Sequence, residues 1–291
     1  MIDSGIVVAP STSPANLSPW HRGGAGDSLV LLHGINASWR IWRPVLGALQ
    51  RDHDVFAPTL PGHLGGPSLD PEKPVSISAL ADGVERTLDE VGIDTAHLVG
   101  NSLGGWLAIE LGRRGRARSV VAVSPAGGWG SPRDLSRVLR LLSAGRMMID
   151  RGDRFAITSL VLRPRFRRLA FHAVMEHGER VPPAEAIEML ADAAGCDAFP
   201  GFAHWIRTTK TLARADAEQT YPIRIAWAEH DRTIPFQRYG RPVLDVLAGA
   251  EHITLESVGH VPMFDDPALV ARTILQVTRS PEFSANHGQL M

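Results

Sequence analysis

The chain has 291 residues, of which 44% are hydrophobic and 21% are charged. This length suffices for one large α/β domain with an inserted subdomain and allows a substantial core to be buried. The formal net charge of -1 gives no overall field toward nucleic acid or anionic lipid, which argues against nucleic-acid binding as the function.

Cysteine content and hydropathy narrow the class of protein further. Cys196 is the single cysteine, which rules out an intramolecular disulfide and argues against a thiolate metal site. The apolar runs fall well short of the roughly 20 residues that span a bilayer, and the first ten residues lack a signal-peptide core. We therefore expect a soluble cytoplasmic protein with no metal ion and no membrane span.

Short apolar runs alternate with amphipathic segments along most of the chain. The runs predict strands at Ser28–His33, Asp54–Thr59, Thr95–Asn101, Ser119–Ser124, Ile223–Ala228 and His252–Glu256. The segments between them predict helices at Trp39–Arg51, Ser78–Val91, Leu103–Arg114, Arg241–Leu247 and Pro267–Thr278. Because the runs are apolar throughout, this alternation predicts a parallel sheet with helices on both faces.

The alternation stops between residues 127 and 212, where helical periodicity rich in Arg, Leu, Met and Ala replaces it. We interpret this segment as a helical cap over the carboxyl edge of the sheet. The predicted organisation is a core at 1–126 and 213–280, a cap at 127–212 and a flexible tail at 281–291. The arginines of the cap are interpreted as solvated faces of amphipathic helices, with an anionic partner as the alternative.

The stretch G-N-S-L-G at 100–104 places Ser102 between a predicted strand and a predicted helix. This is the G-x-S-x-G nucleophile elbow in its expected context, where a tight turn strains the serine backbone and the glycines relieve crowding. The helix that begins at Leu103 directs free N–H groups toward an oxyanion beside the serine. We therefore predict that Ser102 is a nucleophile.

A serine nucleophile needs a base, and the base needs an orienting carboxylate. Asp231 follows one strand candidate and His260 follows the next, in the chain order Ser, Asp, His that accompanies such an elbow. The alternatives are the acids Glu229 and Asp265 and the histidines His63, His230 and His252, whose positions fit the loop ends less well. We predict a triad of Ser102, Asp231 and His260.

The loop after the first predicted strand reads H-G-I-N at positions 33–36. Gly34 lets the backbone turn so that the N–H of Ile35 faces the same point as the N–H of Leu103, and we predict these two groups as the oxyanion hole. His33 is expected to brace the loop through side-chain hydrogen bonds rather than to act as a base.

Together these motifs resemble a serine-nucleophile member of the α/β-hydrolase superfamily with a helical cap. They are L-V-L-L-H-G at 29–34, P-T-L-P-G-H at 58–63, L-V-G-N-S-L-G-G at 98–105, A-E-H-D-R-T-I-P at 228–235 and V-G-H-V-P at 258–262. The resemblance covers nearly the whole chain outside the cap. It implies the α/β-hydrolase fold, with a mostly parallel eight-stranded sheet and a lid inserted after strand six, and hydrolysis without a metal or organic cofactor.

Under this resemblance we expect a serine esterase that cleaves a carboxylic ester or related acyl bond of a small to medium apolar substrate. The elbow is also similar to that of carbon–carbon bond hydrolases of aromatic-ring degradation, which makes a diketone-type ketone substrate an alternative. The spacing of Trp39 and Trp42 resembles epoxide hydrolases and haloalkane dehalogenases, but both use an aspartate where this chain has Ser102. A non-catalytic ligand-binding protein is the remaining alternative.

Large apolar residues near the elbow, in the cap or beside the histidine loop are candidates for the substrate pocket. Those predicted are Trp106, Trp129, Met147, Trp205 and Met263, with Met148 and Phe264 at similar positions. Such residues at helical spacing are also typical of a core. We expect enough of them to line the cleft between cap and sheet to favour an apolar substrate.

Overall fold

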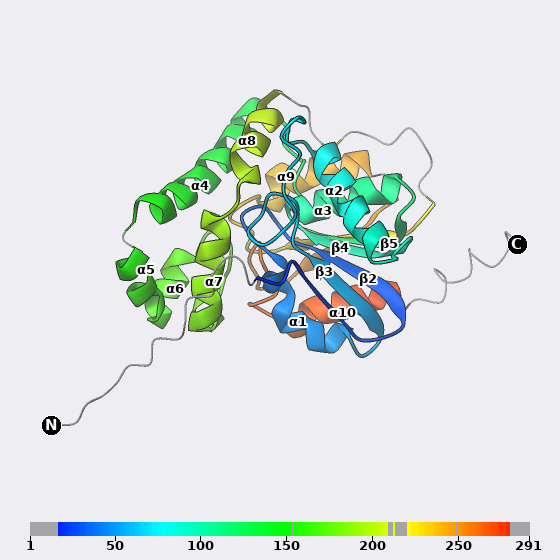
Figure 1. The fold of residues 1–291 in the computed structure, drawn as a ribbon, viewed down its shortest axis with the longest axis horizontal. Helices are drawn as coiled ribbons and strands as arrows, with labels where there is room; N and C mark the ends of the chain where they lie inside the picture. Colours follow the sequence, from blue (N-terminus) through cyan, green and yellow to red (C-terminus); the bar gives the residue numbers. More distant parts are fainter. Residues whose placement is uncertain (1–16, 153, 209–211, 213–219, 248, 280–291) are drawn as a thin grey trace, which may run out of the picture.

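The computed structural model describes residues 17–152, 154–208, 212, 220–247 and 249–279 (Figure 1). Within these residues seven strands form one sheet in the order β1-β3-β2-β4-β5-β6-β7. They are β1 (Trp20–Gly23), β2 (Asp27–Leu32), β3 (His53–Pro58), β4 (Ala96–Asn101), β5 (Ala117–Val123), β6 (Ile223–Ala228) and β7 (Glu251–Leu255). Neighbouring strands are parallel except β1, which is antiparallel to β3.

All six strands predicted from apolar runs are present, as β2 to β7, whereas β1 was not predicted. Its sequence, W-H-R-G, contains no apolar run because β1 is a short, half-exposed edge strand. The resemblance implied eight strands, and the described residues form seven. The predicted tail at 281–291 lies outside the described residues.

Helices cover both faces of the sheet. The helices α2 (Ile77–Glu90), α3 (Leu103–Arg113) and α9 (Phe236–Val246) contribute to the core on one face, and α1 (Arg43–Leu49) and α10 (Pro267–Thr278) contribute to the core on the other (Figure 1). A 3-10 turn, η2 (Trp39–Trp42), precedes α1 and occupies the start of the helix predicted at 39–51. The helix predicted at 241–247 in fact begins earlier, at Phe236. The prediction missed its first turn because Pro242 lies inside the helix and interrupts the sequence pattern.

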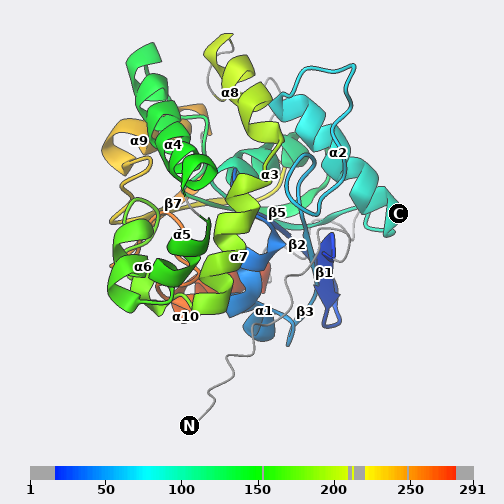
Figure 2. The same cartoon turned by 60° about the vertical axis from the view of Figure 1, so that its left-hand side comes forward.

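The inserted segment between β5 and β6 contains helices and connecting turns and no strand in its described part. It comprises α4 (Pro132–Arg151), α5 (Arg154–Val161), α6 (Pro164–Ala170), the 3-10 turn η3 (Gly178–Arg180), α7 (Pro183–Ala194) and α8 (Ala198–Thr208). These helices lie beyond the carboxyl ends of the parallel strands (Figure 2). The resemblance implied a lid after strand six, whereas the insertion follows β5, the fifth strand of the described residues. Nowhere in the described ranges is there a helix with the length and apolarity to cross a bilayer.

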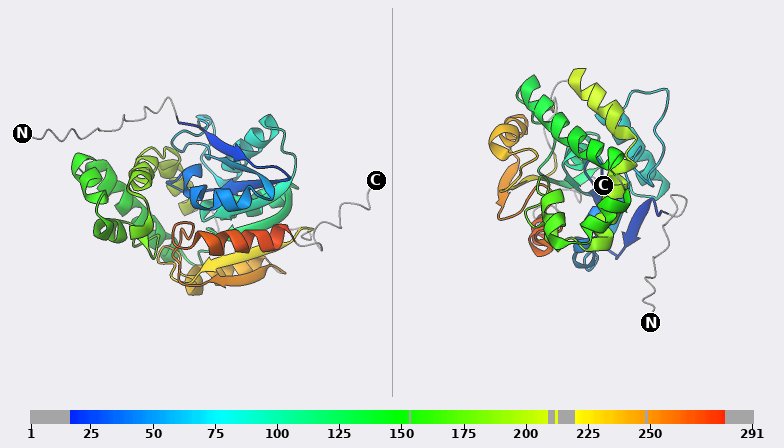
Figure 3. Two further views of the ribbon diagram at one scale, coloured as in Figure 1. Left: turned by 90° about the horizontal axis from the view of Figure 1, so that it is seen from below. Right: turned by 90° about the vertical axis from the view of Figure 1, so that its left-hand side faces the viewer.

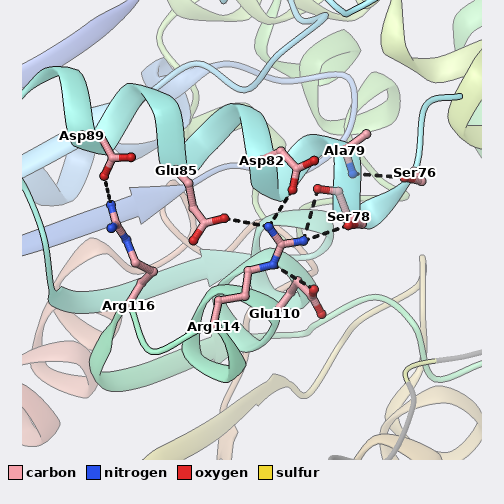
Figure 4. A network of polar contacts seen from close by, with 9 residues as sticks. All are labelled: Ser76, Ser78, Ala79, Asp82, Glu85, Asp89, Glu110, Arg114 and Arg116. Atoms are coloured by element: carbon pink, nitrogen blue, oxygen red, sulfur yellow. Dashed lines mark hydrogen bonds and ion pairs between the residues drawn. The ribbon is translucent and has the colours of Figure 1, made fainter. Parts of the chain in front are cut away.

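Polar contacts tie α2 to the end of α3. Arg114 follows α3, and its guanidinium binds Asp82 at 2.7 Å, Glu85 at 2.6 Å and Glu110 at 3.1 Å (Figure 4). The three carboxylates raise the pKa of Arg114 against the opposing effect of its burial. Since the cation lies between three anions, it balances charges that would otherwise repel one another across the helix pair.

We expect Arg114→Met to lower the free energy of unfolding by about 1–3 kcal/mol, because it leaves three carboxylates without their cation. Urea unfolding followed by circular dichroism measures the change. Arg118→Met is the matched control, since the side chains of its pair with Asp27 are 40% and 63% exposed, and it should cost less than about 1 kcal/mol. Equal losses in the two variants would contradict this role for Arg114.

Three buried histidines have depressed pKa values. Burial lowers the pKa of His63 and of His97 to about 4, and it lowers that of His33 well below its ordinary value of 6.5. All three are therefore neutral in the folded protein near neutral pH. In the unfolded chain each takes up a proton as the pH falls through about 6.5. Each histidine therefore contributes its full stabilisation above pH 6.5, and this contribution is lost progressively as the pH falls toward the pKa of that histidine in the folded protein.

We expect the free energy of unfolding to decrease between pH 6.5 and pH 4, by up to about 1.4 kcal/mol per pH unit for each such histidine. His63→Phe should make this dependence shallower, because the unfolded chain then takes up one proton fewer. Urea unfolding at a series of pH values tests this, with the exposed His204→Gln as the control. A dependence as steep in His63→Phe as in the unsubstituted protein would refute the prediction.

Candidate active site

Four strand ends bring the predicted site residues to one edge of the sheet. Gly34 and Ile35 follow β2, Ser102 follows β4, Asp231 follows β6 and His260 follows β7. Ser102, Ile35 and His260 all line one cavity between the core and the cap. The carboxyl ends of parallel strands meet at the same edge, which is why residues far apart in the sequence converge there.

Ser102 occupies the turn between β4 and α3 with φ 56° and ψ -115°. Its N–H donates to the carbonyl of Val123 at 3.0 Å, and its carbonyl accepts from the N–H groups of Trp106 and Ala126. A Cβ at Gly100 would collide with the carbonyl of the first turn of α3, and one at Gly104 would collide with the carbonyl of Leu32. Glycine at both positions therefore permits the close approach of α3 to the strands.

His260 and Asp231 form a buried pair. The Nδ1 atom of His260 lies 2.7 Å from Oδ2 of Asp231, and both side chains are at most 5% exposed. The other carboxylate oxygen accepts from the N–H groups of Thr233 at 3.0 Å and Ile234 at 2.7 Å. Because an ionised carboxylate only accepts, His260 donates through Nδ1, and its Nε2 keeps a lone pair that can take a proton.

The alternative acids and histidines have other partners. Asp265 accepts from the N–H groups of Glu176, His177 and Gly259, and Glu229 accepts from the N–H of Ser257. Around the other histidines, His230 lies by Glu176 and Glu229, His252 stacks on Phe236, and His63 contacts His33. The structure thus brings only Asp231 to His260 among the acids considered.

Asn101 is a residue that the sequence analysis did not single out. Its amide donates to the carbonyl of His260 at 2.8 Å and to the carbonyl of Val123 at 3.2 Å, and the side chain is buried. The amide therefore links the elbow directly to the backbone of the histidine loop. The position of Asn101 next to Ser102 in G-N-S-L-G was the signal that could have identified it as a site residue. The sequence alone does not indicate which groups its amide binds.

The predicted oxyanion loop lies against the serine. A Cβ at Gly34 would come within 3.2 Å of the Cβ of Ser102, and both Ile35 and Leu103 line the cavity. His33 accepts the N–H of Leu60 at Nε2, 2.9 Å away, and its Nδ1 donates to the carbonyl of Gly34 at 2.8 Å. These bonds give His33 the bracing position expected from the sequence.

The cap contacts the far end of the same loop. Asp192 on α7 accepts a hydrogen bond from the Ser38 hydroxyl at 2.6 Å and pairs with Arg40 of η2. Burial raises the pKa of Asp192, and Arg40 acts in the opposite direction. Arg43 and Glu188 form a second, more exposed pair beside it. The position of the oxyanion loop is therefore linked to that of a cap helix.

The cavity has a volume of about 420 Å³ and a predominantly apolar lining. The cap contributes mainly aliphatic and aromatic side chains from α4, α7 and α8. These include Leu135, Val138, Leu139, Leu142, Met189, Phe199, Phe202 and Ile206. Ser102 and His260 belong to the same lining, to which the cap also contributes the polar side chains of Arg146 and Asp192. This arrangement suits a mainly apolar molecule whose reactive polar group faces the serine.

Of the five residues predicted to contact substrate, Trp129 lines this cavity and the other four do not. Trp106 is buried in the core below it, and Trp205 packs against Trp106. Met263 is fully buried in the core on the other face of the sheet. Met147 is 46% exposed on α4. Trp106, Trp205 and Met147 lie on helices, and helical spacing does not reveal which face of a helix meets the cavity. Met263 lies in the turn before α10.

Within the described residues, neither the thiol of Cys196 nor the acidic side chains form a metal site. Cys196 is buried, and burial raises the pKa of its thiol to about 11. The described residues contain no group of three or more His, Cys, Asp or Glu side chains placed to hold a metal ion.

Comparison with known proteins agrees with this architecture. The family model described as "Alpha/beta hydrolase family" matches residues 29–273. The chain is 38% identical over 204 residues to epoxide hydrolase EphH of Mycobacterium tuberculosis, covering 69% of this chain and 94% of that protein.

Solved structures show the same fold at low sequence identity. A thermophilic esterase from Thermogutta terrifontis has a TM-score of 0.67 and 18% identity, covering 89% of this chain and 92% of its own. The 2-hydroxy-6-oxo-6-phenylhexa-2,4-dienoate hydrolase from a Rhodococcus species has a TM-score of 0.68 and 20% identity, covering 90% and 94%. The chain therefore belongs to the alpha/beta hydrolase family, and the expectation of a hydrolase on this fold is confirmed.

Proposed function

We propose that this protein is a serine hydrolase that cleaves a carboxylic ester of a small to medium, mainly apolar substrate. The observation that carries the proposal is the buried pair of His260 and Asp231 opening onto the same apolar cavity as Ser102, which sits in a strained elbow. An ester has the carbonyl that such a nucleophile attacks, and its hydrocarbon parts match the lining of the cavity.

In the proposed reaction, Nε2 of His260 takes the proton of the Ser102 hydroxyl as Oγ bonds to the ester carbonyl carbon. Asp231 stabilises the imidazolium, and the N–H groups of Ile35 and Leu103 bind the oxyanion. The oxyanion then collapses, the carbon–oxygen bond to the alcohol breaks, and His260 returns the proton to the departing oxygen. Water, deprotonated by the same histidine, then attacks the acyl-serine carbonyl. The bond between the acyl carbon and Oγ of Ser102 breaks, His260 returns the proton to Oγ, and the acid is released.

Epoxide hydrolysis is the second candidate, because EphH shares 38% identity with the chain. Attack by the Ser102 oxygen on an epoxide carbon would form an ether. Unlike an acyl-serine, an ether offers no carbonyl for water to attack, so the enzyme would stay alkylated after one turnover. Multiple turnover of an epoxide would require water itself to be the nucleophile, with His260 as the base. The chemistry of a serine nucleophile therefore favours the ester.

We expect a fluorophosphonate to label Ser102, and we expect Ser102→Ala to lower turnover of a p-nitrophenyl butyrate ester by at least about 10³-fold. Peptide mass spectrometry locates the label, and the ester assay measures the rate. Asp231→Asn and His260→Ala should also abolish labelling, since both remove activation of the hydroxyl.

Ser257→Ala is the matched control, because Ser257 has a similar φ of 57° but does not line the cavity. It should keep full labelling and turnover. Styrene oxide is assayed alongside the ester. Esterase activity that survives in folded Ser102→Ala would contradict the proposal, and multiple turnover of styrene oxide by that variant would establish the epoxide reaction instead.

The cavity should also set the chain-length preference. Leu139 lines it from α4 and is 4% exposed. We expect Leu139→Trp to lower kcat/KM for an octanoate ester at least tenfold relative to an acetate ester, because the larger side chain fills space needed by the longer acyl group. Leu139→Met, of similar volume, should leave the ratio near that of the unsubstituted protein. An unchanged octanoate-to-acetate ratio in Leu139→Trp would place the acyl group elsewhere.

A further inference from the structure

The cavity opens through the cap. Among its lining residues, those that are exposed are Ala144, Gly145 and Met148 on α4 and Ala170 at the end of α6. The other lining residues are buried or half-buried. The mouth of the cavity therefore lies at the exposed lining residues of α4 and α6. The side of the molecule that the cap forms faces the viewer in the right panel of Figure 3.

Exposed apolar side chains concentrate in the same part of the cap, from the end of α4 to α6. Six large apolar side chains are exposed in the described residues, and five of them lie between residues 147 and 169. They are Met147 (46%), Met148 (72%), Leu160 (37%), Leu162 (54%) and Leu169 (73%). The sixth, Trp20, is on the edge strand β1. Such clustering marks an interaction surface more often than scattered exposure does.

The charge of this segment differs from that of the whole protein. Residues 144–170 contain seven arginines and two aspartates, whereas the full chain has a formal net charge of -1. Arg151, Arg163, Arg165 and Arg168 are exposed there. The rest of the chain is correspondingly acidic, so the protein has a positive end at the cap. Electrostatic attraction turns this positive end toward an anionic surface, even though the overall charge is close to zero.

We propose that the outer cap face, defined by Met147, Met148, Leu160, Leu162, Leu169 and the four exposed arginines, docks on an anionic lipid surface. The aliphatic side chains enter the boundary between headgroups and acyl chains, and the guanidinium groups contact lipid phosphates. The mouth of the cavity then faces the lipid. An apolar ester can pass from the lipid to Ser102 without its hydrocarbon part crossing water.

Lipid fits this face better than a folded protein partner does, because apolar side chains and arginines surround the entrance of an apolar cavity. The docking does not depend on the proposed hydrolysis, whereas its use for substrate entry rests on that function. The two are separated by measuring vesicle binding without substrate and by testing Ser102→Ala, which should bind vesicles as the unsubstituted protein does.

The test is co-sedimentation with vesicles of phosphatidylcholine alone or of phosphatidylcholine mixed with phosphatidylglycerol. We expect binding to the anionic vesicles, weak binding to the neutral ones, and loss of binding at about 1 M salt, where the screening length is about 3 Å. Arg163→Gln with Arg165→Gln should weaken binding about fivefold for each arginine removed. Leu162→Ser with Leu169→Ser should weaken it at least tenfold.

Trp20→Ser is the matched control, since it removes the exposed apolar side chain that lies outside the outer cap face, and it should bind as before. Leu162 and Leu169 do not line the cavity, so turnover of a water-soluble acetate ester should be unchanged in their variant. Absence of binding to anionic vesicles, or equal binding by the leucine variant, would overturn the proposal. A dimer in sedimentation equilibrium that the leucine variant dissociates would overturn it in favour of a second copy of the chain.

Discussion

The strained backbone of Ser102 is the constraint on which the rest of the site depends. A φ of 56° is costly for a residue with a side chain, and it persists here because three backbone hydrogen bonds hold the turn on both sides. Glycines at 100 and 104 let α3 start directly against the strands. Since β4 lies between β2 and β5, the elbow projects the serine between the loop after β2 and the loops after β6 and β7.

The cap and the core share buried carboxylates at this edge. Asp192 of the cap pairs with Arg40 and accepts from Ser38 next to the oxyanion loop. From the core, Asp265 accepts N–H groups of the cap residues Glu176 and His177, and it also accepts the N–H of Gly259 in the histidine loop. A buried charge is costly without its partners. The placement of the cap and the arrangement of the loops at the candidate site are therefore energetically coupled.

The separation of polar and apolar surface gives the site its chemical character. Ser102 and His260 are among the few polar residues that line the cavity, and most of the lining is aliphatic and aromatic. Charge interactions are stronger where water is excluded, so N–H groups directed at an oxyanion act with greater effect there. Four exposed arginines of the cap, by contrast, lie on the outer cap face. The sequence analysis interpreted the cap arginines as solvated faces of helices, with an anionic partner as the alternative.

Much of the fold and of the candidate site could be predicted from the sequence. Apolar runs located β2 to β7, of which β2 to β6 are largely buried and β7 is a mostly exposed edge strand. The local requirements of a tight elbow identified Ser102. The short edge strand β1 was not predicted because its sequence, W-H-R-G, contains no apolar run. Only the tertiary structure paired Asp231 with His260 rather than with another acid, showed the contact from Asn101 to the histidine loop, and replaced four of the five predicted pocket residues with others from the cap. Those outcomes depend on which face of each helix meets the cavity and on contacts between residues far apart in the chain, and neither is encoded in local sequence patterns.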